Sequence, residues 1–304
     1  MAFDHIHAKA QALLNAPVEE RLSAIRRDRF IPYEAGSVMM AEMDKILLTP
    51  SVVRARCLLL VGEAGMGKTA LVDFVSRHYA ALLGDVAPKR LVHVILPPVT
   101  VDRAMFYQRI LKSLGVPFRK TDKPDFLHEQ VIEALRDFGT LVLLIDEFHN
   151  FLGAGAKRHI QEHMAAIRDI ANIPVSIVAA GTRLAESCIL ADEQLEQRFL
   201  RYHLNAWGET DELRDFLATW ESRIPLARPS DLAGSTLLPL IMRFTLGHMR
   251  RMIELIKKAA ELAVTTKEEC ITEALIRQAL QEMSHVLPGY VDPGAAGMPQ
   301  RRVA

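Results

Sequence analysis

A glycine-rich segment that ends in a lysine and a threonine carries the clearest chemistry in the sequence. Its residues are Gly62, Glu63, Ala64, Gly65, Met66, Gly67, Lys68 and Thr69, and Ala70 opens the helix-like stretch that follows. Consecutive backbone N–H groups and the positive end of a helix can hold a dense anion, and glycines let the backbone approach it closely. Lys68 offers a mobile charge to phosphates, and the Thr69 hydroxyl suits Mg²⁺. The pattern G-x-x-x-x-G-K-T after an apolar stretch therefore predicts a site for ATP or a similar nucleoside triphosphate with Mg²⁺.

Two adjacent acids follow a second apolar stretch, at 141–145. Asp146 is placed to hold Mg²⁺ through water at the carboxyl end of a strand beside the phosphate loop. Glu147 can orient and activate the attacking water, a task for a carboxylate near the metal but not on it. The pair therefore predicts hydrolysis as well as binding, which argues against an adaptor that only binds nucleotide.

Three further positions have a possible site role and a plainer structural one. Thr182 follows an apolar stretch and a glycine, so its hydroxyl could lie near the γ-phosphate or the turn could cap the next helix. Arg198 or Arg201 could reach a neighbouring subunit's γ-phosphate, or could favour the C-terminal dipole of its own helix. Arg250 could sense the nucleotide from a helix start, or could belong to a solvated face.

Alternating elements must position these residues. Apolar stretches at 57–61, 91–96, 141–145, 175–180 and 201–206 read as strands, and the stretches at 70–83, 103–114, 123–138 and 156–171 read as helices. Near-continuous apolar strands between helices are typical of a buried parallel sheet covered on both faces. The sequence therefore predicts an α/β fold.

The chain divides into four parts in this interpretation. Residues 1–56 form a helical and extended segment that packs on the core, and residues 57–207 form the α/β nucleotide-binding core. Residues 208–286 contain helices at 210–224, 237–244, 248–264 and 272–285 and form a helical module. Residues 287–304 are rich in Pro, Gly and Ala and are expected to be a disordered tail.

Composition limits the class of protein. The 304 residues contain 37 Lys and Arg against 37 Asp and Glu, which argues against a globally basic nucleic-acid binder but leaves room for a basic patch. The three cysteines are far apart and have no metal-ligand spacing, which favours reduced thiols in a cytoplasmic protein. No apolar run reaches the length of a membrane span, so no membrane partner is expected.

The order of these motifs resembles the AAA+ ATPases, and more narrowly the TniB/TnsC family of ATP-dependent transposition regulators. The closer match lies in four segments of residues 20–285, namely Arg29-Phe30-Ile31-Pro32, Ile145-Asp146-Glu147, Gly181-Thr182-Arg183-Leu184, and Asp192-Glu193-Gln194-Leu195 with Arg198-Phe199. The resemblance implies a P-loop NTPase core with a five-stranded parallel sheet and a C-terminal helical lid.

The resemblance also implies roles. Lys68 and Thr69 would contact phosphate and Mg²⁺, Asp146 would hold Mg²⁺, and Glu147 would be the catalytic base. Thr182 would be the first sensor, Arg198 the arginine supplied in trans, and Arg250 the second sensor. Residues near the adenine would be Arg29, Ile31, Pro32 and Tyr33. One departure is clear, because many AAA+ proteins restrain the catalytic glutamate with a polar residue after the second strand, where this chain has Leu96-Pro97-Pro98.

The implied partners are duplex DNA, a transposase, a TniQ-like target-selection adaptor and further copies of the chain in a filament or ring. The DNA contacts, which would grip phosphates without reading sequence, are expected at Thr100, Arg103, Arg119, Lys120, Thr121 and Lys123. The expected function is ATP-dependent assembly on DNA, target marking and stimulation of the transposase, with hydrolysis driving disassembly. A helicase loader or a secretion or envelope ATPase with the same core is the alternative.

Overall fold

The computed structural model describes residues 5–48, 55–84, 89–152 and 157–284. Their contacts form two compact units, one made of 34–205 and the other of 5–33 with 206–284. The sequence-based interpretation kept 1–56 together on the core, whereas these contacts group 5–33 with the C-terminal helices. The predicted disordered tail at 287–304 lies outside the described residues.

A parallel sheet forms the centre of the first unit. Its strands are β1 (Cys57–Gly62), β2 (Leu91–Ile95), β3 (Val142–Asp146), β4 (Ser176–Gly181) and β5 (Phe199–Leu204). They lie in the order β2-β3-β4-β1-β5, and each neighbouring pair is parallel. The predicted α/β class with a five-stranded parallel sheet is confirmed.

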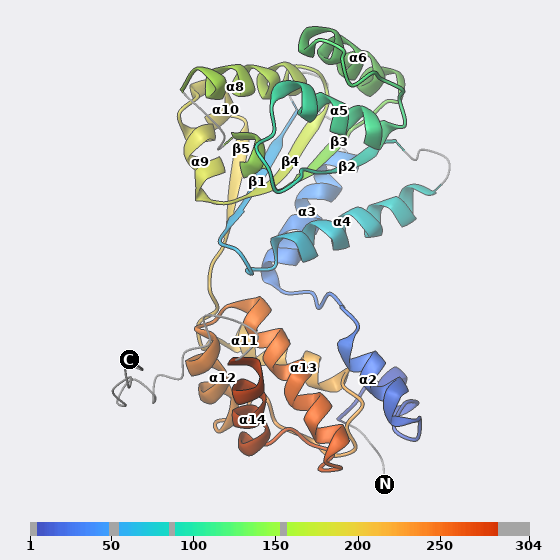
Figure 1. Ribbon diagram of the computed structural model, residues 1–304, viewed down its shortest axis with the longest axis vertical. Coiled ribbons are helices and arrows are strands. Elements are labelled where there is room, and N and C mark those ends of the chain that lie inside the picture. The colour runs from blue at the N-terminus through green and yellow to red at the C-terminus, as the bar shows by residue number, and fades with distance from the viewer. Residues whose placement is uncertain (1–4, 49–54, 85–88, 153–156, 285–304) are drawn as a thin grey trace, which may run out of the picture. The chain divides into compact units, whose positions relative to one another are not determined.

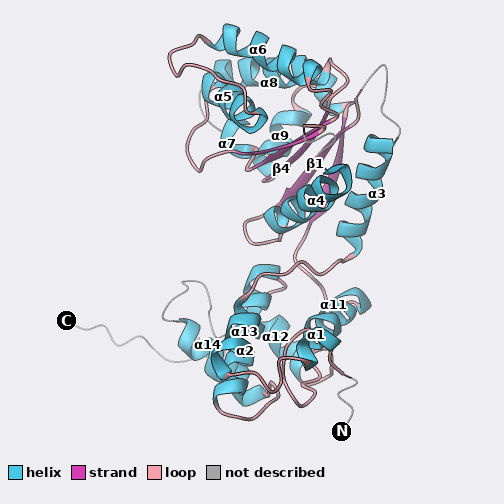
Figure 2. Ribbon diagram, turned by 90° about the vertical axis from the view of Figure 1, so that its right-hand side faces the viewer, coloured by secondary structure: helices cyan, strands magenta, loops and turns pink. Residues whose placement is uncertain are grey.

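Helices cover both faces of this sheet (Figures 1 and 2). On one side lie α3 (Glu34–Leu48) and α4 (Lys68–Leu83), joined where the Tyr79 hydroxyl donates to the Met40 carbonyl and to Asp44. On the other side lie α5 (Arg103–Leu114), α6 (Pro124–Asp137) and α8 (Lys157–Ala171). The shorter helices of this unit are α7 (His149–Leu152), α9 (Arg183–Leu190) and α10 (Glu193–Glu196).

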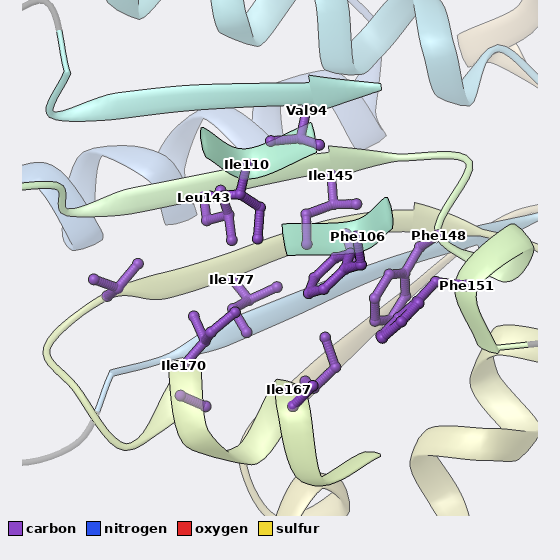
Figure 3. Close-up of a cluster of buried hydrophobic side chains, with 14 of the residues drawn as sticks. Val94, Phe106, Ile110, Leu143, Ile145, Phe148, Phe151, Ile167, Ile170 and Ile177 are labelled. Atoms are coloured by element: carbon purple, nitrogen blue, oxygen red, sulfur yellow. The ribbon is translucent and has the colours of Figure 1, made fainter. Parts of the chain in front are cut away.

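The main apolar core lies between the sheet and the α5, α6 and α8 side. Alternate strand residues such as Leu143, Ile145 and Ile177 point into it and are fully buried, as Figure 3 shows. The rings of Phe106 and Phe151 stack there with centroids 4.1 Å apart. Because a strand sends successive side chains to opposite faces, Asp146 belongs to the other face, toward α4.

The second unit is helical. It contains α1 (Ala8–Gln11), α2 (Val18–Arg26), α11 (Asp211–Ser222), α12 (Leu237–Thr245), α13 (Met249–Thr265) and α14 (Glu273–Ser284). The α2 helix packs on α13, and the buried Arg21 guanidinium binds both carboxylate oxygens of Glu269 at 2.8 and 2.5 Å. It also donates to the Pro225 carbonyl at 2.7 Å. Charge-assisted bidentate bonds of this kind tie the N-terminal helices to the C-terminal ones.

The last strand differs from the element expected from the sequence. The last strand begins at Phe199 and ends at Leu204, whereas the pattern suggested 201–206. Its side chains are mostly exposed between a buried first and last residue, so it lacks the continuous apolar signal of the inner strands.

In the ranges that the structure describes, no helix has both the length and the apolar composition needed to cross a membrane.

The stacked core gives a stability prediction. Phe106→Ala should lower the free energy of unfolding of the sheet-containing unit by about 3–5 kcal/mol, because it leaves a cavity in a fully buried cluster. Phe126→Ala is the matched control, since that ring is 52% exposed on α6 and should change stability by no more than about 0.5 kcal/mol. Urea unfolding followed by hydrogen exchange of the sheet amides measures both. Equal effects of the two substitutions would contradict this account of the core.

Candidate nucleotide-binding site

The carboxyl edge of the sheet brings together three segments that are far apart in the sequence. The glycine-rich loop follows β1, Asp146 ends β3, and Thr182 follows β4, which lies between those two strands. The pairing of Val61 with Gly181 and of Ile145 with Ala179 sets the ends of these strands level with one another. This is the edge at which open α/β sheets bind ligands.

Glycine is required at several points of the loop. Gly65 and Gly67 have φ values of 81° and 88°, in the left-handed region that favours glycine. A Cβ on Gly62 would lie only 3.0 Å from the Leu204 carbonyl oxygen. Gly67 is the N-cap of the long helix α4, so the loop ends where unpaired N–H groups and the helix dipole favour an anion.

The Lys68 side chain spans the loop. Lys68 as a whole residue is 7% exposed. Its ammonium donates to the carbonyl oxygens of Gly62 at 2.7 Å and Glu63 at 2.9 Å. Burial lowers the pKa of Lys68. The carboxylates of Glu147, Asp146 and Glu63 act in the opposite direction, because they favour the charged form. A phosphate oxygen could take over the role of the loop carbonyls and supply a better partner for this cation.

The oxygen donors fit Mg²⁺. Thr69 is exposed in the first turn of α4, and Asp146 is 1% exposed at the end of β3, with Oδ1 accepting the Glu147 N–H at 2.8 Å. Mg²⁺ is usually bound by one or two protein oxygens, phosphates and water. Among the described residues no group of three or more His, Cys, Asp and Glu side chains is placed to hold a metal ion.

Glu147 begins a tight turn at the edge of the site. Its φ of 58° is unusual for a residue with a side chain. Two backbone hydrogen bonds close the turn. The Phe148 N–H donates to Ala180 O of β4 at 2.8 Å, and the Asn150 N–H donates to Glu147 O at 2.9 Å. The turn brings His149 Nε2 to 3.5 Å from Glu147 Oε2. Sequence reasoning missed His149, although a histidine two residues after the acid pair was a visible signal.

The β4 tip approaches this turn closely. A Cβ on Gly181 would lie 2.8 Å from Ala185 Cβ and 3.5 Å from His149 N. Thr182 is the N-cap residue of α9 but makes no side-chain cap bond. Its contact with a γ-phosphate stays a prediction. A second feature missed from the sequence is Arg183, whose Nε lies 3.6 Å from Glu63 Oε1 in the phosphate loop.

Arg198 lies at the amino edge of the sheet, where the strands begin, whereas the phosphate loop lies at the carboxyl edge. It precedes β5, and its guanidinium donates to Ala171 O and, at 2.7 Å, to Asn172 Oδ1, two residues that precede β4. The phosphate loop follows the six-residue strand β1, so the two edges are about 20 Å apart at the rise of a parallel strand. Arg198 therefore does not belong to the site of its own chain. Arg201 is exposed on β5.

The remaining proposed nucleotide contacts lie in the other unit. Arg250 forms an exposed ion pair with Glu254, one turn further along α13, at 2.8 Å. Arg29 donates to the carbonyls of Ala24 and Arg223. Its guanidinium lies over the ring of Trp220. The positions of these residues relative to the phosphate loop, and a role for them in nucleotide binding, stay predictions.

The residues expected near the adenine pack within that unit. Tyr33 is 9% exposed, with its ring 5.5 Å from that of Trp207, and Ile31 is buried, whereas Pro32 is exposed. Burial, helped by the charge of Glu212, raises the pKa of Tyr33.

The expected DNA contacts lie around the starts of α5 and α6. The loop between these helices turns back along α5, because Gln108 Nε2 donates to the Lys120 carbonyl at 3.3 Å. Arg103 binds Asp125 at 2.8 Å, which joins the two helix starts. The exposed residues are Thr100, Arg119, Lys120, Thr121 and Lys123. The structure thus places cationic and hydroxyl side chains together on one surface region, which we name the α5–α6 basic surface, and their contact with DNA stays a prediction.

Comparison with known sequences finds relatives among Clp-type proteins. The ATP-binding subunit ClpL of the ATP-dependent Clp protease of Lactococcus lactis subsp. lactis is 30% identical over 165 residues, which are 51% of this chain and 19% of ClpL. The chaperone protein ClpB of Malacoplasma penetrans is 32% identical over 125 residues, 40% of this chain and 15% of ClpB. The chain thus spans about a fifth or less of these relatives.

Solved structures share the fold. The Aeropyrum pernix ORC1 protein in complex with DNA has a TM-score of 0.63 and 17% identity, covering 88% of this chain and 72% of that chain. A Thermotoga maritima RuvB structure has a TM-score of 0.51 and 21% identity, covering 86% and 74%.

A family model settles the classification. The model described as "Bacterial TniB protein" matches residues 21–209, a range that contains the phosphate loop, the Asp146-Glu147 pair and Arg198. The fold, with its five-stranded parallel sheet between helices, is that of the AAA+ P-loop ATPases. The chain therefore belongs to the bacterial TniB protein family.

Proposed function

We propose that this protein is an ATP-hydrolysing regulator of DNA transposition. With ATP it assembles on duplex DNA, marks a target, and recruits or stimulates a transposase with the help of a TniQ-like adaptor. Hydrolysis then disassembles the complex. The observation that carries the proposal is the meeting of Lys68, Thr69, Asp146 and Glu147 at one sheet edge of a TniB-family chain.

Each side chain of the site has a separate role in ATP hydrolysis. Loop N–H groups and Lys68 bind the phosphates and offset the charge that develops as the γ-phosphoryl group leaves. Thr69 and Asp146 would hold Mg²⁺, which would supply further charge neutralisation. Glu147 orients a water in line with the γ-phosphate and accepts its proton. Thr182, beside this edge, detects the γ-phosphate.

A second subunit completes the site in this proposal. Arg198 is about 20 Å from its own phosphate loop along the strand direction, so it can act only on a neighbour's nucleotide. A planar guanidinium suits the charge on a leaving phosphoryl group, and such arginines raise phosphoryl transfer by about 10³–10⁵. Assembly and hydrolysis are then coupled, because neither subunit holds a full set of catalytic groups alone.

The α5–α6 basic surface supports DNA as the partner. Its cations contact phosphates without reading bases, and repetition along a filament adds their effects. This distribution allows a chain with zero formal net charge to bind DNA. A related fold occurs in an ORC1 protein solved in complex with DNA, which is compatible with this partner.

Electron microscopy tests the scaffold role directly. The full chain with duplex DNA and a non-hydrolysable ATP analogue should form filaments or rings, whereas omission of the nucleotide should leave dispersed subunits. Lys68→Ala should abolish assembly, because the loop loses its only side-chain cation for the phosphates. Dispersed wild-type subunits in the presence of both ligands would remove the scaffold role from the proposal.

Glu147→Gln separates binding from hydrolysis. Glutamine keeps the shape of the side chain but is no base, so ATP and DNA binding should persist while turnover falls by at least about 10², as expected for loss of a general base. The DNA-bound complex should therefore last longer. Phosphate release and the dissociation rate from labelled DNA measure the two effects. Loss of ATP binding in this variant would show that the role assigned to Glu147 is wrong.

The salt dependence of DNA binding tests the α5–α6 basic surface. The double substitution Arg119→Ala/Lys120→Ala should weaken binding to all sequences alike and reduce the slope of log K against log salt by about 1.8, at about 0.9 per phosphate contact. Arg77→Ala/Arg136→Ala is the control, since it removes two exposed arginines elsewhere on the same unit. Fluorescence anisotropy over a salt series gives both slopes. An unchanged slope in the first variant would place the DNA contacts elsewhere.

A further inference from the structure

The Glu147 carboxylate has a polar neighbour from its own turn. His149 Nε2 lies 3.5 Å from Glu147 Oε2, and the side chains are only 25% and 37% exposed. This is within reach of an N–H···O contact that can shorten when the site fills, as catalytic hydrogen bonds often do. The histidine is therefore placed to act on the orientation of the proposed base.

The backbone fixes this placement. The left-handed conformation of Glu147 and the bonds of Phe148 N–H to Ala180 O and of Asn150 N–H to Glu147 O make a closed turn. Phe148 and Phe151, on either side of His149, are fully buried among the core rings (Figure 3). The imidazole is thus held beside the carboxylate by groups that do not depend on the imidazole itself.

The other ring nitrogen indicates which nitrogen of the imidazole can donate to a neighbouring group. Nδ1 of His149 is buried and has no hydrogen-bond partner among the described residues. A hydrogen there would be a buried donor without an acceptor, which costs free energy. A hydrogen on Nε2, in contrast, has the Glu147 carboxylate oxygen 3.5 Å away as its acceptor.

The second strand offers no polar substitute at this position. Ile95 is in register with Asp146 and is 59% exposed, and Leu96 after it is buried. Both side chains are apolar, so neither can bind the Glu147 carboxylate. His149 Nε2, in contrast, lies 3.5 Å from that carboxylate, and Lys68 acts on it electrostatically from the phosphate loop.

We propose that His149 is a positioning residue that orients the Glu147 carboxylate toward the attacking water. This inference rests on the proposed function, in which Glu147 is the catalytic base. In this proposal the turn that follows β3 restrains the catalytic glutamate. The tip of β2, where many AAA+ proteins have a polar residue for this purpose, does not. Its effect should fall on turnover, because nucleotide is bound by the phosphate loop and not by this turn.

A set of three substitutions tests the role in the full chain with ATP, Mg²⁺ and duplex DNA. His149→Ala should lower kcat by about 10–100-fold, by analogy with residues that orient metal ligands, and leave KM and the affinity for a non-hydrolysable analogue unchanged. His149→Gln should restore most of the rate, because its amide nitrogen takes the position of Nε2. His149→Asn should not, since its amide nitrogen takes the position of Nδ1.

Two controls separate the possible outcomes. His128→Ala removes a histidine with the same 3.5 Å spacing to a carboxylate, that of Asp169, outside the site, and should leave kcat unchanged. Glu147→Gln must lower turnover by at least about 10², and if it does not, the proposed function itself fails. If Glu147→Gln is inactive but His149→Ala keeps the wild-type kcat or raises it, the inference alone is overturned. Equal rates for the Gln and Asn variants would also overturn it, even if His149→Ala were too unstable to assay.

Discussion

A triphosphate site needs backbone donors, a cation and oxygen ligands close together, and the parallel alignment of β1, β4 and β3 supplies that proximity here. Because the three strands run the same way and end level, the loop after Gly62, the carboxylate of Asp146 and the hydroxyl of Thr182 share one edge. An antiparallel neighbour would have sent one of them to the far edge. The helices on both faces keep this alignment by burying the strands between them.

The unusual local features gather at the same edge. Glu147 adopts a left-handed conformation, Gly62 touches the neighbouring strand, and the Lys68 ammonium is bound to loop carbonyls although burial opposes its charge. A non-glycine residue in a sparsely populated backbone region costs roughly 1–3 kcal/mol and persists only where its surroundings impose it. The buried Phe148 and Phe151 provide that support, so core packing and site geometry are linked at one turn.

Local patterns were sufficient for the centre of the site and insufficient for its surroundings. The spacing of Gly62, Lys68 and Thr69 and the acids after an apolar strand are short-range signals, so the sequence predicted both groups and the sheet that holds them. The bond of Arg21 to Glu269 joins residues 248 positions apart, and nothing local to either residue indicates it. The contact of His149 with Glu147 depends on one left-handed φ, which residue types alone do not reveal.

The place of Arg198 also has a consequence for how an assembly would grow. If a guanidinium from one sheet edge completes the nucleotide site at the other edge of the next copy, then the two contact surfaces are different and the assembly is head-to-tail. An open filament of this kind has polarity, with one terminal copy whose nucleotide lacks an arginine and another whose arginine has no nucleotide to act on. The ATP of that first terminal copy would turn over more slowly than ATP in the interior. The two ends would therefore differ in the nucleotide that they hold as well as in structure.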